Sequence, residues 1–324
     1  MTRIANLNTY KLKRIDRGTP GWSARVTTLD EISPDICGLQ EVIVDENATP
    51  RERWDSEAAE TIQDFAAACG LTAAVGATLA HPHGTAMAAN FHRPWYTALL
   101  WNPDTVGLVS FRPYGAPDFW HGLTTAQFDV GAREPITVAV YHGDPFRPNF
   151  RADEALRIKG IFRRTGGVKP GFLIGDFNGL SAARLQRRWW QLRGQYYDPE
   201  PYLRQRHDDL EFQVRAGRIG RTFRRQLADR RQTQVLLRND YMVDASAYLN
   251  TPWEPTVGHW DDGKGDPDPW GPRDIDKIFG TRPARPALLS TTIHRSATAL
   301  EASDHLPKYA DFDPRRIVTG QAGR

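Results

Sequence analysis

Two segments of the chain end in side chains that could hold a metal ion or a phosphate. FLIGDFN brings Asp176 and Asn178 directly after a run of apolar and small residues. A run of this kind without helical period predicts a buried strand that delivers both polar groups to a sheet edge. Well over a hundred residues later, SDHLP adds Asp304 and His305. Carboxylate, amide and imidazole groups together suit a hard-cation site that acts on a phosphoester.

Other short segments are expected to deliver further polar groups to the same place. RIANLN is a predicted strand that ends in Asn8, and DICGLQEV is a predicted strand that carries Glu41 near its end. VAVYHGDP predicts a strand that stops at His142. Later, RDIDKIF contains Asp276, but this segment is too short to fix which side chains share a face.

Taken in order and at their approximate spacing, these segments resemble the endonuclease/exonuclease/phosphatase superfamily. That group includes deoxyribonuclease-like nucleases, abasic-site endonucleases, inositol polyphosphate phosphatases and sphingomyelinases. The resemblance spans about Arg3 to Asp313, and several motifs in the same order are far more specific than any one of them. The motifs that carry it are Asn8, the QE of Glu41, His142, the GDFN of Asp176 and Asn178, the IDKIF of Asp276, and the SDH of Asp304 and His305.

The resemblance implies both a fold and a metal site. The implied fold is a four-layer α/β sandwich, in which two mostly antiparallel β-sheets are faced by helices and one active site lies at the sheet edges. Glu41 would be the principal ligand of a divalent cation, Mg²⁺ or Mn²⁺, because a single carboxylate with amide and water oxygens matches an ion that dehydrates reluctantly. Asn8 would help to hold the ion, and Asp304 would be a second carboxylate on the metal side.

The same resemblance implies roles in the reaction. Asp176 resembles the aspartate that activates water, and Asn178 the residue that positions phosphate and nucleophile. His305 resembles the imidazole that contacts the scissile phosphate, and Asp276 the carboxylate that orients it. Such a pair raises the pKa of the imidazole and favours its charged form. His142 would be a second phosphate contact.

The implied reaction is divalent-metal-dependent hydrolysis of a phosphate ester by in-line attack of water. The leading form is cleavage of phosphodiester bonds in nucleic acid, DNA or RNA. A phosphatase or phosphodiesterase that acts on a small-molecule or lipid phosphoester is the alternative, because the motifs report the phosphorus chemistry and not the leaving group. A non-catalytic module that binds nucleic acid on the same fold is the alternative from a different class.

The segment 181–240 has an unusual composition. It contains 14 Arg, no Lys and 7 acidic residues, so it carries +7 while the whole chain carries +3. Arginine presents paired donors that fit phosphate, and the aromatic residues between the arginines could stack on bases. One interpretation is that a polyanionic substrate contacts Arg187, Arg188, Arg224 and Arg225. The other, which the residues favour slightly, is a solvated insertion whose arginines pair with its own acidic residues.

Length and composition allow one large domain or two small ones, and the distributed motifs favour one domain over residues 1–314, with the Arg-rich insertion at about 181–240 and a frayed tail at 315–324. With 324 residues and 40% hydrophobic content, the chain can bury a substantial core. Cys37 and Cys69 are the only cysteines, which suggests no disulfide framework and a reducing compartment. We expect a cytoplasmic protein without a membrane segment, and no obligate protein partner is indicated.

Helical spacing predicts three helices. The first covers Gly21 to Ile32, the second is capped by Thr49 and closed by Gly70, and the third runs from about Ala152 to Arg164. The HPHG segment at 81–84 lacks the partners of a zinc motif and is expected to be a substrate-rim loop or plain surface. Residues 251–272, rich in Pro, Gly and Asp, predict a long loop before the Asp276 segment.

Overall fold

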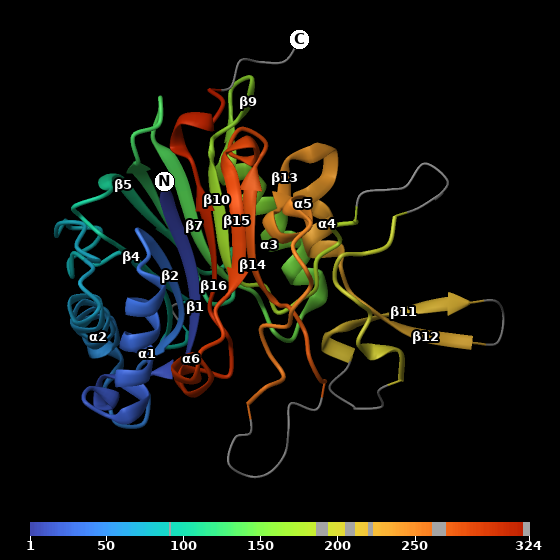
Figure 1. The fold of residues 1–324 in the computed structure, drawn as a ribbon. Helices are drawn as coiled ribbons and strands as arrows, with labels where there is room; N and C mark the ends of the chain where they lie inside the picture. Colours follow the sequence, from blue (N-terminus) through green and yellow to red (C-terminus); the bar gives the residue numbers. More distant parts are fainter. Residues whose placement is uncertain (91, 186–193, 205–210, 220–222, 261–269, 320–324) are drawn as a thin grey trace.

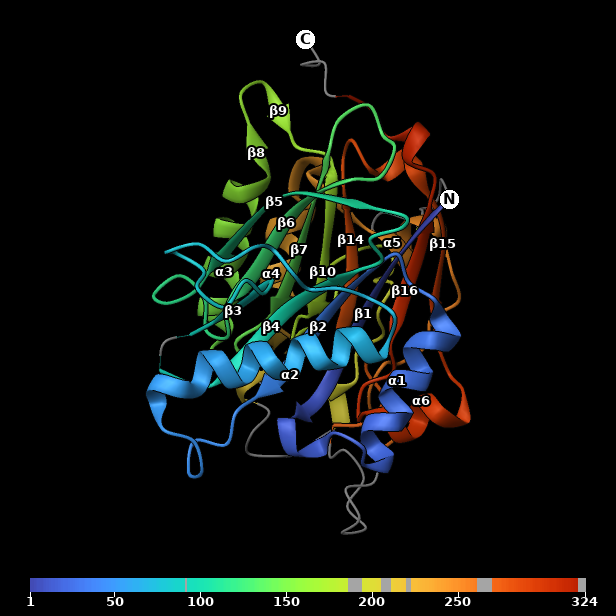
Figure 2. The same cartoon turned by 90° about the vertical axis from the view of Figure 1, so that its left-hand side faces the viewer.

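The computed structural model describes residues 1–90, 92–185, 194–204, 211–219, 223–260 and 270–319. Its body consists of two six-stranded sheets packed face to face, with helices on the outer face of each sheet (Figures 1 and 2). The expected four-layer α/β sandwich is confirmed.

The two sheets are built alike. Among the described strands, each sheet has one parallel pair at its centre, β1 with β2 and β7 with β10, and its other neighbours are antiparallel, as expected. The first sheet has the order β15 (Leu288–Ile293), β16 (Lys308–Phe312), β1 (Thr2–Leu12), β2 (Ile36–Ile43), β4 (Trp95–Trp101), β3 (Met87–Ala89). The second has the order β13 (Met242–Asp244), β14 (Asp276–Thr281), β10 (Gly171–Asp176), β7 (Ile136–His142), β6 (Leu123–Asp129), β5 (Gly107–Tyr114).

The outer layers consist of helices that pack their apolar sides on a sheet. Figure 2 shows α2 (Trp54–Ala68) lying across the first sheet beside α1 (Pro20–Ile32). The second sheet is covered by α3 (Pro148–Phe162) and α4 (Arg231–Leu237). The short elements are α5 (Ala245–Leu249), α6 (Ala297–Ala302), the strand pairs β8 (Arg163–Arg164) with β9 (Gly167–Val168) and β11 (Val214–Ile219) with β12 (Phe223–Ala228), and the 3-10 helices η1 (Arg14–Asp16), η2 (Arg51–Arg53), η3 (Tyr202–Arg204), η5 (Arg238–Asp240), η6 (Arg285–Ala287) and η7 (Pro314–Arg316).

The three predicted helices exist, but their starting points differ from the prediction. The α1 helix begins one residue early, at Pro20, because Thr19 accepts a hydrogen bond from the Trp22 backbone and caps it. Thr49 does not cap α2: its hydroxyl donates to the Glu57 carboxylate, and η2 intervenes before α2 starts at Trp54. The α3 helix begins at Pro148, since proline fits the first turn, where its missing N–H costs nothing.

The main core lies between the two sheets. It is made of apolar residues on the inner faces of the central strands, among them Ile4, Val140 and Ile174. The sheets approach closely at Gly38 of β2, where an added Cβ would lie 2.7 Å from Val140 Cγ2 and 2.8 Å from Ile174 Cδ1. Only glycine fits there, because any side chain would push the two sheets apart.

The Arg-rich segment forms several different structures. Its β11–β12 hairpin projects away from the sandwich (Figure 1), while α4 packs on α3 and buries Leu236 in the outer core. At the C-terminus, Ile317 is buried against the inter-sheet core, so the first residues of the expected tail pack on the fold. The domain boundaries at 181, 240 and 314 stay predictions. In the described part of the chain, no helix has the length and apolarity needed to cross a bilayer.

Candidate active site

The inner faces of the central strands change from apolar to polar at one end of the sandwich. On β1, Ile4 lies in the core and Asn6 and Asn8 follow on the same face, because side chains two apart share a face of a strand. On β10, Ile174 is followed in the same way by Asp176. The strands thus bring one polar cluster together: Asn6, Asn8, Gln40, His142, Asp176 and Asp276.

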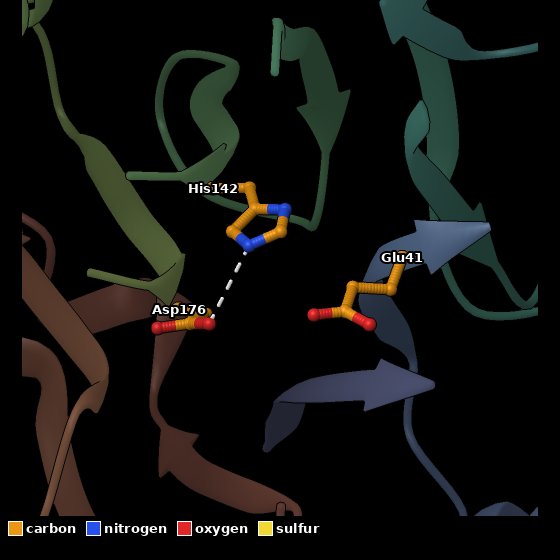
Figure 3. Close-up of side chains that lie close together, drawn as sticks. All are labelled: Glu41, His142 and Asp176. Atoms are coloured by element: carbon orange, nitrogen blue, oxygen red, sulfur yellow. Dashed lines mark ion pairs between the residues drawn. The ribbon is translucent and has the colours of Figure 1, made fainter. Parts of the chain in front are cut away.

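Glu41 reaches this cluster through an unusual backbone conformation. Its φ is 60°, in the left-handed region, and the pairing of β2 with β4 is irregular between Leu39 and Val42. A bulge of this kind re-aims a side chain, and a left-handed conformation is costly for a residue with a Cβ. Glu41 Oε1 accepts a hydrogen bond of 3.3 Å from Asn8 Nδ2. Figure 3 shows Glu41 facing Asp176 and His142 across the end of the sandwich.

Asp176 lies at the centre of the hydrogen bonds of the site. It accepts from Asn8 Nδ2 at 3.2 Å and from the Asn178 backbone at 2.8 Å. Asn178, with φ at 47°, is held in turn because its Nδ2 donates to the Gly143 carbonyl at 3.0 Å. Burial raises the pKa of Asp176 to about 7; His305 opposes this rise, while the negative charge of Asp276 adds to it.

His305 lies between two carboxylates. Its Nδ1 is 2.8 Å from Asp276 Oδ2, and its Nε2 is 4.0 Å from Asp176 Oδ2. Burial lowers the pKa of His305, but Asp276, Asp304 and Asp176 outweigh burial and raise this pKa well above its ordinary value. The ring is therefore an imidazolium at neutral pH. Asp276 is itself fixed, because Asn6 Nδ2 donates to its other oxygen at 3.2 Å.

His142 has the opposite character. Its Nε2 lies 3.5 Å from Asp176 Oδ2, and its ring stacks on the ring of His121 with 4.0 Å between centres and 11° between planes. Burial, with the nearby His121 and His305, lowers the pKa of His142 well below its ordinary value. The site thus combines one charged and one neutral imidazole beside the same carboxylate, Asp176.

The geometry of the fold can be compared with known structures. No protein-family model and no curated protein sequence matches the chain. An abasic-site endonuclease of Archaeoglobus fulgidus matches at 17% identity and a TM-score of 0.53, over 97% of this chain and 100% of that chain. The D. rerio TDP2 complexed with single-strand DNA product matches at 12% and 0.56, over 96% and 98%. A mannosyl-6-phosphatase of Bacteroides thetaiotaomicron matches at 13% and 0.55, over 97% and 100%.

The chain has the endonuclease/exonuclease/phosphatase fold. Similar structures include one named for this family itself, from Bacteroides vulgatus, at 17% identity and a TM-score of 0.55 over 96% of this chain and 98% of that chain. At such identities the likeness establishes the fold. What this version of the endonuclease/exonuclease/phosphatase fold does must be inferred from its own residues.

The residues fit a divalent cation at one position within this fold. Ligand atoms of Glu41, His142 and Asp176 lie within 4.8 Å of one another. Burial and the charge of Asp304 raise the pKa of Glu41, so a bound cation would relieve an unfavourable concentration of negative charge. A second group, Asp176, Asp276 and His305, is equally close but already contains the imidazolium.

Two predicted metal ligands are placed less directly. Asn8 presents its amide nitrogen to both Glu41 and Asp176, so it would have to turn its amide over to become an oxygen ligand. Asp304 lies outside both close groups, and its Oδ1 accepts from the Ser303 hydroxyl at 3.3 Å. Its charge acts on Glu41 and His305. The roles of Asn8 and Asp304 as ligands stay predictions.

The structure gives roles to residues for which the sequence motifs predicted none. Gln40 Nε2 donates to Asn6 Oδ1 at 2.8 Å, and Asn6 donates to Asp276, so two buried amides fix the carboxylate that holds His305. The position of Asn6, two residues before Asn8 in a strand, is a signal that could have revealed it. His121 gave no such signal, since its segment shows only a strand-and-loop pattern.

The structure describes the backbone of only two of the four predicted substrate arginines. Arg187 and Arg188 lie outside the described residues. Arg224 and Arg225 belong to β12, where their backbones pair with Arg218 and Gly217 of β11. All four stay predictions. Other arginines of the segment serve the fold: Arg230 donates to the carbonyls of Ser181, Asp198 and Pro199, and Arg231 pairs with Asp229.

Proposed function

We propose that this protein is a divalent-metal-dependent phosphoesterase that hydrolyses phosphodiester bonds of nucleic acid by in-line attack of water. One observation carries the proposal: Asp176, with a pKa near neutrality, faces the imidazolium of His305 next to the Glu41 carboxylate. A proton acceptor, a fixed positive charge and a metal ligand are what this reaction needs within a few ångströms.

Asp176 serves as the proton acceptor in this mechanism. A carboxylate whose pKa lies near the working pH both accepts a proton and releases it again efficiently. The Asn178 backbone fixes one carboxylate oxygen, and Asn8 fixes the other. Attacking water that binds to Asp176 is therefore held at a defined position relative to the phosphate.

The two imidazoles meet the phosphate oxygens. His305, held by Asp276, presents positive charge where negative charge develops in the transition state. The neutral His142 supplies a hydrogen bond without adding charge, and its stacking on His121 fixes the plane of the ring. Glu41 would hold Mg²⁺ or Mn²⁺ on the facing side, and this ion supplies further positive charge at the phosphate.

Aromatic side chains on both sides of the site support nucleic acid as the substrate. Tyr10, two residues after Asn8, has its ring centre 4.6 Å from that of Trp260. On the side of His142, the Arg147 guanidinium lies 4.4 Å from the ring centre of Trp120. Rings and guanidinium planes beside a phosphate site bind unpaired bases and backbone phosphates without regard to sequence.

The test is a hydrolysis screen of the purified protein against plasmid, single-stranded DNA, RNA and bis-p-nitrophenyl phosphate, with Mg²⁺, Mn²⁺ or EDTA. We expect metal-dependent turnover that Asp176→Asn reduces by about 10³-fold, while Asp104→Asn, an exposed loop variant, behaves as wild type. Turnover of bis-p-nitrophenyl phosphate without cleavage of plasmid, single-stranded DNA or RNA would replace nucleic acid as the substrate. Binding of nucleic acid without turnover of any phosphoester would refute the enzyme.

A further inference from the structure

A cavity beside the active site is not used in this mechanism. It measures about 390 Å³ and lies among the start of α2, the HPHG segment, β4 and the end of β5. This volume falls within the range of roughly 300–1,000 Å³ that is typical of small-ligand sites. The walls combine aromatic and basic side chains: Trp54, Tyr96 and Tyr114 with Arg51, His81 and Arg93. The expected rim loop, HPHG, therefore lines a cavity.

The cavity adjoins the Glu41 and His142 side of the active site. Tyr96 of β4 lies in the cavity wall, and its backbone pairs with Val42 of β2, the residue after Glu41. Asn90, another lining residue, donates from Nδ2 to the Trp120 carbonyl at 2.8 Å. Trp120 precedes His121, whose ring stacks on His142. Trp120 thus lies next to both the cavity lining and the stacked rings of His121 and His142.

Positive charge is concentrated where the cavity meets Trp120. The guanidinium of Arg93 lies 4.7 Å from the Trp120 ring centre, on an indole that also carries Arg147. Arg147 is held by Asp144, whereas the exposed Arg93 makes no ion pair within the described part of the chain. The carboxylate in the lining, Asp55, accepts a hydrogen bond from Tyr96 instead. A guanidinium stacked on a ring keeps its N–H edge available to a phosphate.

We propose that this cavity binds one nucleotide of the substrate, next to the scissile phosphate. Its base packs on the aromatic walls, and its phosphate meets Arg93 at the mouth. Aromatic rings stack on a base, and a guanidinium binds a phosphate. An acyl chain would leave the guanidinium without a partner, and a bare sugar would leave the rings without one. The inference rests on the proposed function and narrows its substrate to a chain of at least two nucleotides.

The first test is kinetic and uses Arg93→Gln with Arg285→Gln as its matched control. The guanidinium of Arg285 also lies against a ring, 5.9 Å from the ring centre of Tyr248. Arg285 follows the C-terminal end of β14, whereas Asp276 and the active site lie at the N-terminal end of this strand. Loss of one charge-assisted contact should raise KM for a single-stranded oligonucleotide about tenfold relative to KM for bis-p-nitrophenyl phosphate. Arg285→Gln should leave that ratio at the wild-type value. An unchanged ratio in Arg93→Gln would overturn the proposal.

The second test needs no turnover, so it separates the cavity from the proposed reaction. Isothermal titration in EDTA measures the Kd of adenosine 3′,5′-bisphosphate for wild type, Arg93→Gln and Arg285→Gln. We expect Arg93→Gln alone to weaken binding about tenfold, and ribose 5-phosphate, which lacks the base, to bind more weakly than the bisphosphate. If the bisphosphate binds in this way to a protein that hydrolyses no substrate of the screen above, the proposed function is refuted and the cavity site stands. Equal affinity for both ligands, or for wild type and Arg93→Gln, would refute the site.

Discussion

Two neighbouring residues of β14 belong to regions that differ in how many cations accompany the buried carboxylates. Asp276 points into the active site, and Lys277 points off the other face of the strand into a closed network. There Lys277 Nζ lies 2.7 Å from Asp198 Oδ2 and 2.8 Å from Asp274 Oδ2, and Lys308 shares Asp274 at 2.8 Å. The surrounding aspartates outweigh burial and raise the pKa of Lys277, so two lysines offset most of the charge of Asp198, Asp244 and Asp274 within the fold.

The active site lacks such compensation. It gathers the carboxylates of Glu41, Asp176, Asp276 and Asp304. The His305 imidazolium lies within 4.0 Å of two of them, while Lys11 and Arg25 act on Glu41 and Asp304 by charge without an ion pair among the described residues. The pKa values of Glu41 and Asp176 are raised; in the lysine network burial also raises the pKa of Asp198 to about 6, but the lysines lower the pKa of Asp274 against burial. The comparison shows that the fold can neutralise buried carboxylates with lysine and does not do so here. A site left short of positive charge is suited to a cation from solution.

The largest expected effect tests the charged pair on the active-site side of β14. If Asp276 orients and charges the imidazole, Asp276→Asn and His305→Ala should each lower kcat by about 10²–10⁴-fold. The double variant should be little worse than the poorer single variant, because the two residues act as a unit. Steady-state kinetics on bis-p-nitrophenyl phosphate measure all three. Losses that multiply would show that the two side chains act independently.

On the other face of β14, the expected effect is on stability. Lys277→Met removes the central cation and leaves Asp198 and Asp274 buried with one lysine fewer, so we expect a loss of about 3–5 kcal/mol in the free energy of unfolding. Urea denaturation measures it. Lys159→Met is the matched control, since Lys159 is only partly buried and bonds a single carbonyl. If Lys277→Met unfolds at the same urea concentration as the control, the network does not carry the stability assigned to it.

The resemblance of the ordered motifs predicted the sandwich, and the strand pattern itself predicted most of the polar cluster. In β1, β7 and β10, apolar residues run directly into Asn8, His142 and Asp176, and a period of two keeps core and site on one face. What depends on the backbone or on distant partners could not be predicted. The left-handed conformation of Glu41 comes from a bulge against β4. Thr49 does not cap α2 because its hydroxyl donates a hydrogen bond to the Glu57 carboxylate.

A third and smaller expected effect is the stabilisation of the active site by a bound metal ion. With Mg²⁺ at a hundred times its Kd, wild type should gain about 2.7 kcal/mol in unfolding free energy. Glu41→Gln should lose most of this gain, yet be at least as stable as wild type in EDTA, because it removes a carboxylate that the site does not neutralise. Thermal unfolding with Mg²⁺ or EDTA measures both. Equal metal-induced shifts in the two proteins would show that Glu41 does not hold the ion.

The smallest expected effect concerns the Arg-rich segment. Arg230 and Arg231 are bonded within the fold and resemble the lysine network. If Arg187, Arg188, Arg224 and Arg225 instead face solvent, their positive charge is available to a polyanion. Replacing all four by Gln should then raise KM for long single-stranded DNA more than KM for bis-p-nitrophenyl phosphate.

The salt dependence of binding decides between the two alternatives for these four arginines. Each phosphate contact on single-stranded DNA contributes about 0.7 to the slope of log K against log salt, because bound counterions are released. The quadruple variant should therefore lower this slope by up to about 3, whereas Arg315→Gln with Arg316→Gln, exposed on η7, should leave it unchanged. Titrations of Asp176→Asn protein with labelled DNA measure the slope without cleavage. An unchanged slope in the folded quadruple variant would assign these arginines, like Arg230, to the fold.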